Sequence, residues 1–95
     1  MIHSTVMTLE SIQDYLENNV FYPTVEVQIA SDGDLSTKDF YVCEFGHKWT
    51  CTDYNYENGE AEFYCEELNA GLHGVIKTEQ TYLGEIFNFV IHYAD

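Results

Sequence analysis

The sequence predicts one α+β domain, in which a largely antiparallel sheet of about five strands carries two helices on one face. Two segments show the apolar spacing of amphipathic helices, and the remaining segments alternate or are rich in β-branched and aromatic residues. The 95 residues include one proline and no linker rich in glycine or serine, so residues 1–95 are expected to form a single domain. The expected order of elements is α-β-β-β-α-β-β.

The chain is expected to begin with a helix and a strand. Residues 8–19 follow helical spacing, with Thr8 as the N-cap. Residues 24–30 alternate and contain several β-branched residues, which predicts a strand, and Asp32-Gly33 then predicts a turn. The expected buried stripe of the helix consists of Leu9, Ile12, Tyr15 and Leu16.

Two further strands are expected over residues 38–45 and 48–54, joined by a tight loop at residues 46–47. A two-residue loop at that position fixes the register and sends alternate side chains to opposite faces. The opposing pairs in this register are Phe45–Lys48, Val42–Cys51 and Cys43–Thr50.

A second helix is expected within residues 58–72, with Asn58 as its cap and Gly71 suited to the C′ position. Asn58-Gly59 also suits a hairpin turn, but an apolar stripe favours the helix. That stripe consists of Ala61, Tyr64, Cys65, Leu68 and Leu72. Residues 75–78 and 84–93 predict the last two strands. The side chains expected to face the core in the final strand are Phe87, Phe89, Ile91 and Tyr93.

The charge of the chain is strongly unbalanced. Asp and Glu number 17 against three lysines and no arginine, which gives a formal net charge of −14. Such a surface repels itself and destabilises the compact state, so we expect it to serve a strongly basic partner. The same charge argues against direct binding of nucleic acid or an anionic membrane. No apolar run approaches the roughly 20 residues that a membrane span needs.

The expected placement of the acids is unfavourable for stability. In both predicted helices, carboxylates recur at spacings of four and seven residues with no basic residue nearby. Each like-charge pair four residues apart costs a helix about 0.2–0.5 kcal/mol. This placement favours a binding role, and the alternative is a solvated face that keeps the protein soluble.

The segment over residues 53–62 mixes acids with tyrosines, a residue type that is enriched at interface hot spots. We therefore expect the main partner-binding patch to consist of Asp53, Tyr54, Tyr56, Glu57, Glu60, Glu62, Glu66 and Glu67. A second candidate patch consists of Glu10, Asp14 and Glu17.

Metal binding and catalysis are not expected. Cys43, His47, Cys51 and Cys65 are competent zinc ligands, but their spacing matches no common structural zinc pattern, and buried thiols are the simpler interpretation. The odd number of cysteines and an N-terminus without a secretory pattern predict a cytoplasmic protein. We expect no enzyme and no cofactor.

In size, charge and expected build, the chain resembles the small acidic anti-defence proteins of bacteriophages, the anti-CRISPR and DNA-mimic class. The resemblance implies an inhibitor that binds a basic nucleic-acid-binding surface of a target protein in the host cytoplasm. One alternative is an immunity protein for a basic nuclease toxin. Two others are a small metal or thiol enzyme using the cysteines, and a structural or assembly protein whose charge confers solubility. The oligomeric state stays open.

Overall fold

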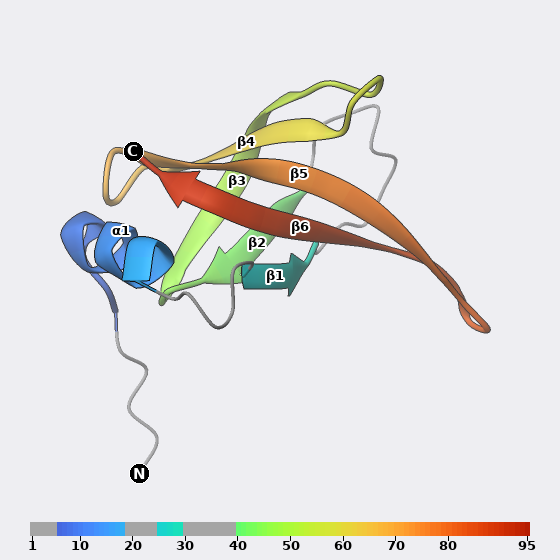
Figure 1. Cartoon of the computed structure of the whole chain (residues 1–95), viewed down its shortest axis with the longest axis horizontal. Helices are drawn as coiled ribbons and strands as arrows, with labels where there is room; N and C mark the ends of the chain where they lie inside the picture. Colours follow the sequence, from blue (N-terminus) through green and yellow to red (C-terminus); the bar gives the residue numbers. More distant parts are fainter. Residues whose placement is uncertain (1–5, 19–24, 30–39) are drawn as a thin grey trace, which may run out of the picture.

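The computed structural model describes residues 6–18, 25–29 and 40–95. Within these residues, one helix is followed by six strands (Figure 1). Their bounds are α1 Leu9–Asn18, β1 Val25–Gln28, β2 Tyr41–Glu44, β3 His47–Tyr54, β4 Glu60–Cys65, β5 Ala70–Thr81 and β6 Gly84–Ala94. The expected α+β domain with two helices is therefore wrong, because a single helix accompanies a sheet that makes up most of the described chain.

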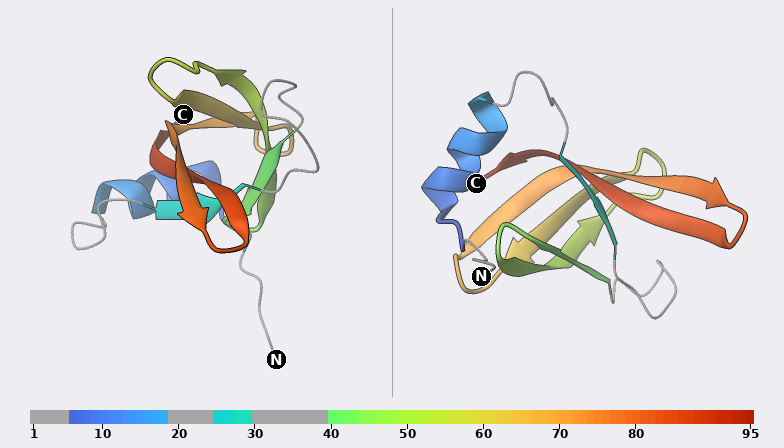
Figure 2. Two further views of the ribbon diagram at one scale, coloured as in Figure 1. Left: turned by 90° about the vertical axis from the view of Figure 1, so that its right-hand side faces the viewer. Right: turned by 90° about the horizontal axis from the view of Figure 1, so that it is seen from below.

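All six strands belong to one antiparallel sheet with the order β1-β6-β5-β4-β3-β2. Its two outermost strands, β1 and β2, approach each other, so the sheet curls into a nearly closed barrel (Figure 2). Closure of this kind protects the strand edges, which would otherwise present unpaired backbone groups. The helix α1 packs beside β6, where Gln13 Nε2 donates a hydrogen bond of 3.2 Å to the carbonyl of Ala94.

The core fills the inside of the curled sheet. Phe63 lies at its centre, with ring centroids 5.8 Å from Phe40 and 4.3 Å from Phe89. Trp49 is fully buried, and its indole N–H donates a 3.0 Å hydrogen bond to the carbonyl of Glu44. The helix contributes Ile12, which is also fully buried. Each buried aromatic side chain removes a large apolar area from water, which matters in a domain of this size.

The helix expected over residues 58–72 is instead a strand, a turn and the start of another strand. Ala61, Phe63 and Cys65 are buried while the residues between them are more exposed, which is the two-residue period of a half-buried strand. Gly59 takes a φ of 81° in the turn before β4, a backbone conformation that glycine adopts readily. Asn58-Gly59 therefore belongs to a hairpin turn and does not start a helix. The strand that follows, β4, is stabilised by backbone pairing with β3 on one side and with β5 on the other.

The loop between β2 and β3 lies one residue earlier than expected. Phe45 and Gly46 form the turn with φ values of 59° and 80°, and Glu44 pairs with His47. Positive φ at both central residues is typical of the tight turns that match the twist of a hairpin. The expected pairs are therefore wrong. The observed pairs are Glu44–His47, Cys43–Lys48, Val42–Trp49 and Tyr41–Thr50.

Other expectations are confirmed. The first helix lies where its periodicity predicts it, and the Thr8 hydroxyl accepts a 3.2 Å hydrogen bond from the backbone N–H of Ser11 as an N-cap. On its predicted stripe, Ile12 is buried, whereas Tyr15 remains 45% exposed. β1 lies within residues 24–30 as expected. The turn expected at Asp32-Gly33 lies outside the described residues.

Candidate partner-binding surface

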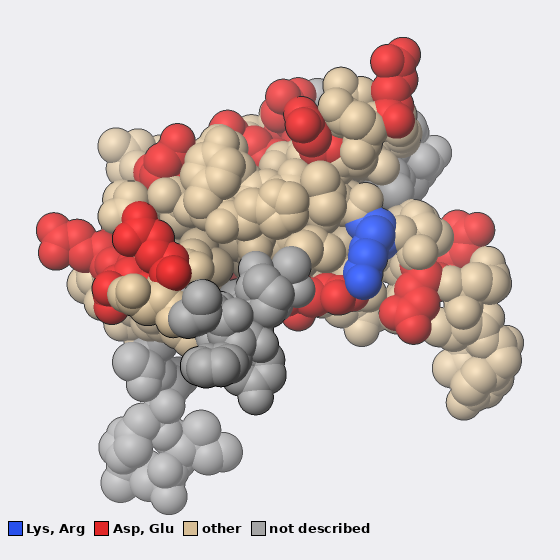
Figure 3. All heavy atoms as spheres, viewed as in Figure 1, with Lys and Arg blue, Asp and Glu red and all other residues tan. Residues whose placement is uncertain are grey.

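The outer side of α1 carries one row of acids. Glu10, Asp14 and Glu17 are all exposed, on the side of the helix away from the buried Ile12. Asn18 Nδ2 donates a hydrogen bond to a carboxylate oxygen of Asp14. Figure 3 shows acidic side chains gathered at the α1 end of the molecule. We call these three carboxylates the helix stripe.

A second group of acids lies on the outer face of β3 and β4. Asp53 pairs with Glu62 across the two strands, and Glu60 lies two residues along β4 on the same face. A carboxylate oxygen of Glu62 accepts a hydrogen bond of 3.1 Å from the Thr52 hydroxyl, which orients the side chain. These acids are therefore held on paired strands rather than on a loop.

Two tyrosines lie at the end of the β3–β4 hairpin: Tyr54 is the last residue of β3, and Tyr56 lies in the turn that follows. Tyr54 is half-buried against Phe40, and its ring centroid lies 4.6 Å from that of Tyr56. Tyr56 is 58% exposed, and Glu57 beside it is exposed. We call the whole group the hairpin face. It consists of Asp53, Tyr54, Tyr56, Glu57, Glu60 and Glu62.

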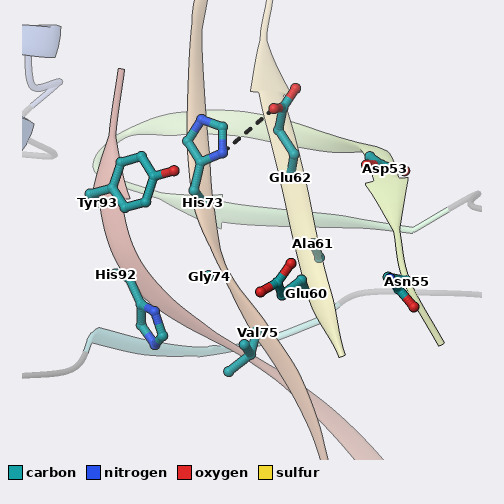
Figure 4. A pocket seen from close by; sticks show the side chains of 10 residues that line it. All are labelled: Asp53, Asn55, Glu60, Ala61, Glu62, His73, Gly74, Val75, His92 and Tyr93. Carbon is teal, nitrogen blue, oxygen red and sulfur yellow. Dashed lines mark ion pairs between the residues drawn. The ribbon is translucent and has the colours of Figure 1, made fainter. Parts of the chain in front are cut away.

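The hairpin face continues into a hollow of about 340 Å³ over β4, β5 and β6 (Figure 4). His73 of β5 lies beside Glu62, with 3.5 Å between its Nδ1 and a carboxylate oxygen. Its Nε2 lies 2.6 Å from a carboxylate oxygen of Asp95, and its ring stacks on Tyr93 at 4.6 Å and 10°. The residues that line the hollow are Asp53, Asn55, Glu60, Ala61, Glu62, His73, Gly74, Val75, His92 and Tyr93.

This arrangement is suited to accepting hydrogen bonds from cationic groups. An imidazole that carries a proton on each nitrogen can donate to both of its carboxylate neighbours, Glu62 and Asp95. Asp53 and Glu60 remain at the rim with exposed carboxylates, which accept hydrogen bonds from a guanidinium or an ammonium group. The hollow therefore offers carboxylate hydrogen-bond acceptors beside the stacked rings of His73 and Tyr93.

A β-bulge in β6 creates the aromatic side of the hollow. His73 pairs with Tyr93, but Gly74 pairs with Ile91, so His92 is an extra residue. The bulge turns Tyr93 outward, where it is 55% exposed, so the expectation that Tyr93 faces the core is wrong. The expectation holds for Phe89 and Ile91, which are buried, and Phe87 is partly buried against the core.

Gly74 is the residue that permits this bulge. A Cβ at this position would lie 1.9 Å from the carbonyl oxygen of Val90, so only glycine fits between the two backbones. Sequence reasoning missed His73, Tyr93 and Asp95 as members of this face. The available signal in the sequence was the run of three apolar residues Phe89-Val90-Ile91, which breaks the alternation of the final strand.

Glu66 and Glu67 lie apart from the hairpin face, in the turn between β4 and β5. Six residues of β4 rise by about 20 Å in total, so Glu60 and Glu66 lie at opposite ends of the strand. A Glu67 carboxylate oxygen lies 3.6 Å from Nδ1 of the buried His47, whose Nε2 is 2.7 Å from the carbonyl of Met7. We call these two acids the turn pair. The patch expected from a continuous helix is therefore divided.

Few of these negative charges are neutralised by lysine. Every Asp and Glu of the described residues is exposed or partly exposed. Within the same residues, Lys77 Nζ contacts Glu26 at 3.0 Å, and Lys48 lies over the ring of Tyr41 at 4.4 Å. Figure 3 shows acidic side chains spread over the visible face with a single basic group among them. The three acidic surfaces thus keep most of their charge available.

The cysteines do not gather into a site. Cys43 is exposed, whereas Cys51 and Cys65 are buried. In the part of the chain that the structure describes, no three side chains among His, Cys, Asp and Glu are grouped so that they could hold a metal ion. The metal-enzyme alternative therefore receives no geometric support from these residues.

Comparison with known proteins finds no matching protein family, no matching curated protein and no matching solved structure. Among the described residues, no helix combines the length and the apolar character needed to cross a membrane. The helix stripe, the hairpin face and the turn pair are the features from which we infer a function.

Proposed function

We propose that this protein is a stoichiometric inhibitor that binds a basic, nucleic-acid-binding surface of a target protein or complex. It would act in the host cytoplasm in the manner of anti-CRISPR and DNA-mimic proteins, without a cofactor and without catalysis. One observation supports this above all: in the described residues, every Asp and Glu is at least partly exposed, and only Glu26 forms an ion pair with a lysine. A basic partner surface is what such charge would attract.

The spacing of the acids on the hairpin face suits replacement of phosphates. Cross-strand neighbours such as Asp53 and Glu62 have Cβ atoms about 5 Å apart, and residues two apart on one strand, such as Glu60 and Glu62, are separated by about 7 Å. Duplex DNA presents about one negative charge per 1.7 Å of its axis, and proteins bind it with matching lysines and arginines. A rigid sheet with carboxylates at fixed separations presents anionic groups to those side chains, although at a lower density than the duplex does.

The hairpin face is our first choice among the three acidic surfaces. It combines carboxylates on paired strands with the exposed ring of Tyr56 and the hollow beside His73. Aromatic anchors surrounded by polar groups are typical of the few residues that dominate interface energies. The helix stripe has acids but a less exposed aromatic neighbour in Tyr15, and the turn pair has only two carboxylates.

The test compares three variants that remove charge and keep side-chain shape. They are Glu10→Gln/Asp14→Asn/Glu17→Gln for the helix stripe, Asp53→Asn/Glu60→Gln/Glu62→Gln for the hairpin face, and Glu66→Gln/Glu67→Gln for the turn pair. Tagged wild type is used as bait in a nuclease-treated bacterial lysate at low and high salt. The captured protein is then purified, and displacement of its labelled nucleic acid by each variant is titrated.

We expect wild type to displace the nucleic acid at a one-to-one ratio, with an affinity that falls as salt increases. The hairpin-face variant should lose at least about tenfold in affinity and show a shallower salt dependence. A saturated target that still binds its nucleic acid would refute the proposal, and equal affinities of all three variants would refute the role of these acids. A target that is a nuclease toxin encoded beside this gene would instead identify an immunity protein.

A further inference from the structure

The two longest strands extend beyond the curled sheet as a free arm. β4 pairs with β5 only as far as Val75, and β1 pairs with β6 only over residues 88–91. The β5–β6 pairing continues past these points to Thr81 and Gly84. The segment from Thr78 to the tip, paired with β6 from Phe87 onward, is therefore a two-stranded arm about 13 Å long. Figures 1 and 2 show it projecting away from the rest of the molecule.

The tip of this arm carries two apolar residues in open solvent. Tyr82 is 96% exposed and Leu83 is 84% exposed. The turn itself is ordered, because the Thr81 hydroxyl donates a 2.7 Å hydrogen bond to the carbonyl of Gly84 and accepts one of 3.2 Å from the backbone N–H of Leu83. The two apolar side chains are thus presented on a fixed backbone, which lowers the entropy lost on binding.

Turn chemistry does not explain the choice of these residues. Two-residue hairpin loops favour glycine, asparagine and aspartate, which accept positive φ angles. Tyr82 and Leu83 are not among the residues with positive φ, and they bury almost nothing in this protein. The other two-residue hairpin loop described here differs, because Phe45 in it is buried. The φ angles of Tyr82 and Leu83 place no demand on the residue type, so nothing in the turn itself requires two large apolar side chains there.

The charges near the tip are negative and would be attracted to a basic surface on a partner. Glu79 and Glu85 are exposed on the two strands just behind the tip. Lys77, farther from the tip, has its ammonium group 3.0 Å from a Glu26 carboxylate oxygen. The distal part of the arm therefore presents an aromatic and an aliphatic side chain flanked by two carboxylates.

We propose that the arm inserts into the nucleic-acid groove of the target, with Tyr82 in the pocket that normally holds an unstacked base. Grooves that bind single-stranded nucleic acid combine basic residues along the backbone path with aromatic side chains on which bases stack. Tyr82 and Leu83 supply the apolar and stacking surface, and Glu79 and Glu85 face the basic rim. This inference rests on the proposed function and narrows its target to proteins that hold unpaired bases.

The test uses the full chain and the purified target from the experiment above. The Tyr82→Ser/Leu83→Ser variant should weaken binding by about thirtyfold or more, while its salt dependence stays that of wild type. Tyr82→Phe keeps the ring and should stay within about threefold of wild type. Val6→Ser is the control for loss of an exposed apolar side chain, because Val6 is 57% exposed and lies outside the arm and the three acidic surfaces. Unchanged Trp49 fluorescence confirms that each variant is folded.

A photo-crosslinking amino acid in place of Tyr82 then locates the tip in the complex. A crosslink to the base-binding pocket of the target supports the inference. A crosslink elsewhere on the target, a crosslink to a second copy of this chain, or full affinity of the Tyr82→Ser/Leu83→Ser variant overturns it. If the hairpin-face variant loses affinity and the tip variant does not, only this inference fails. If no nucleic-acid-binding target responds to either change, the proposed function fails with it.

Discussion

Replacement of Gly74 by alanine should strongly destabilise the fold. The new Cβ would lie 1.9 Å from the carbonyl oxygen and 2.9 Å from the carbonyl carbon of Val90, and 3.1 Å from Cα of Ile91. All three atoms belong to the backbone of β6, so β5 and β6 must separate at the bulge. Overpacking of this kind costs about 1–3 kcal/mol, and a weakened ladder hydrogen bond adds about 1 kcal/mol. We therefore expect a loss of about 2–4 kcal/mol in the free energy of unfolding.

The measurement is urea unfolding followed by the fluorescence of Trp49, the single tryptophan, which is fully buried. A loss of that size corresponds to a fall of about 10–30 °C in melting temperature for a domain of this length. Gly71→Ala is the matched control, because its Cβ would meet the side-chain ends of His73 and Asp95 at 3.3 and 3.4 Å and the carbonyl oxygen of Phe63 at an ordinary contact distance of 3.7 Å. We expect that control to cost less than about 1 kcal/mol. A Gly74→Ala protein within about 0.5 kcal/mol of wild type would show that the bulge does not depend on this glycine.

Two further predictions concern the helix and the charge. Thr8→Ala removes the hydroxyl that caps α1 and should cost about 1 kcal/mol in the same urea assay, whereas no change would mean that the cap contributes nothing to stability. Added salt should raise the melting temperature by several degrees, because it screens repulsion among the 17 acids. A melting temperature that does not respond to salt would show that the acids are too far apart to repel one another measurably.

The elements with a single dominant periodicity could be predicted from the sequence. Residues 8–19 contain an N-cap and a helical stripe, and the structure has α1 there. The final strand was predicted from the alternating apolar residues Phe87, Phe89 and Ile91, and the structure has β6 there with Phe89 and Ile91 buried. Residues 58–72 fit both the helical period and the strand period. Ala61 and Cys65 are four residues apart, as on one face of a helix, and with Phe63 they also occupy alternate positions, as on one face of a strand. Local pattern alone could not separate these two choices.

For the candidate binding surface, the sequence predicted that the acids are exposed but did not predict how they are grouped in space. Each predicted acid of the described chain is at least partly exposed, as the charge pattern required. Their grouping depended on the wrong helix, which would have placed Glu66 and Glu67 next to Glu62. The strand β4 instead separates them, and its pairing brings Asp53, Glu62, His73 and Tyr93 into one row across four strands.

The sequence by itself determined the sign of the surface, the position of the first helix and the alternation of most strands, because these properties depend on residues close together in the chain. Only the tertiary structure decided that the second half is all sheet, that a bulge turns Tyr93 toward His73, and that the β5–β6 arm projects with Tyr82 and Leu83 exposed. Each of these features depends on backbone pairing between distant segments. Gly74 illustrates the reason, since its role follows from the approach of Val90 and not from its sequence neighbours.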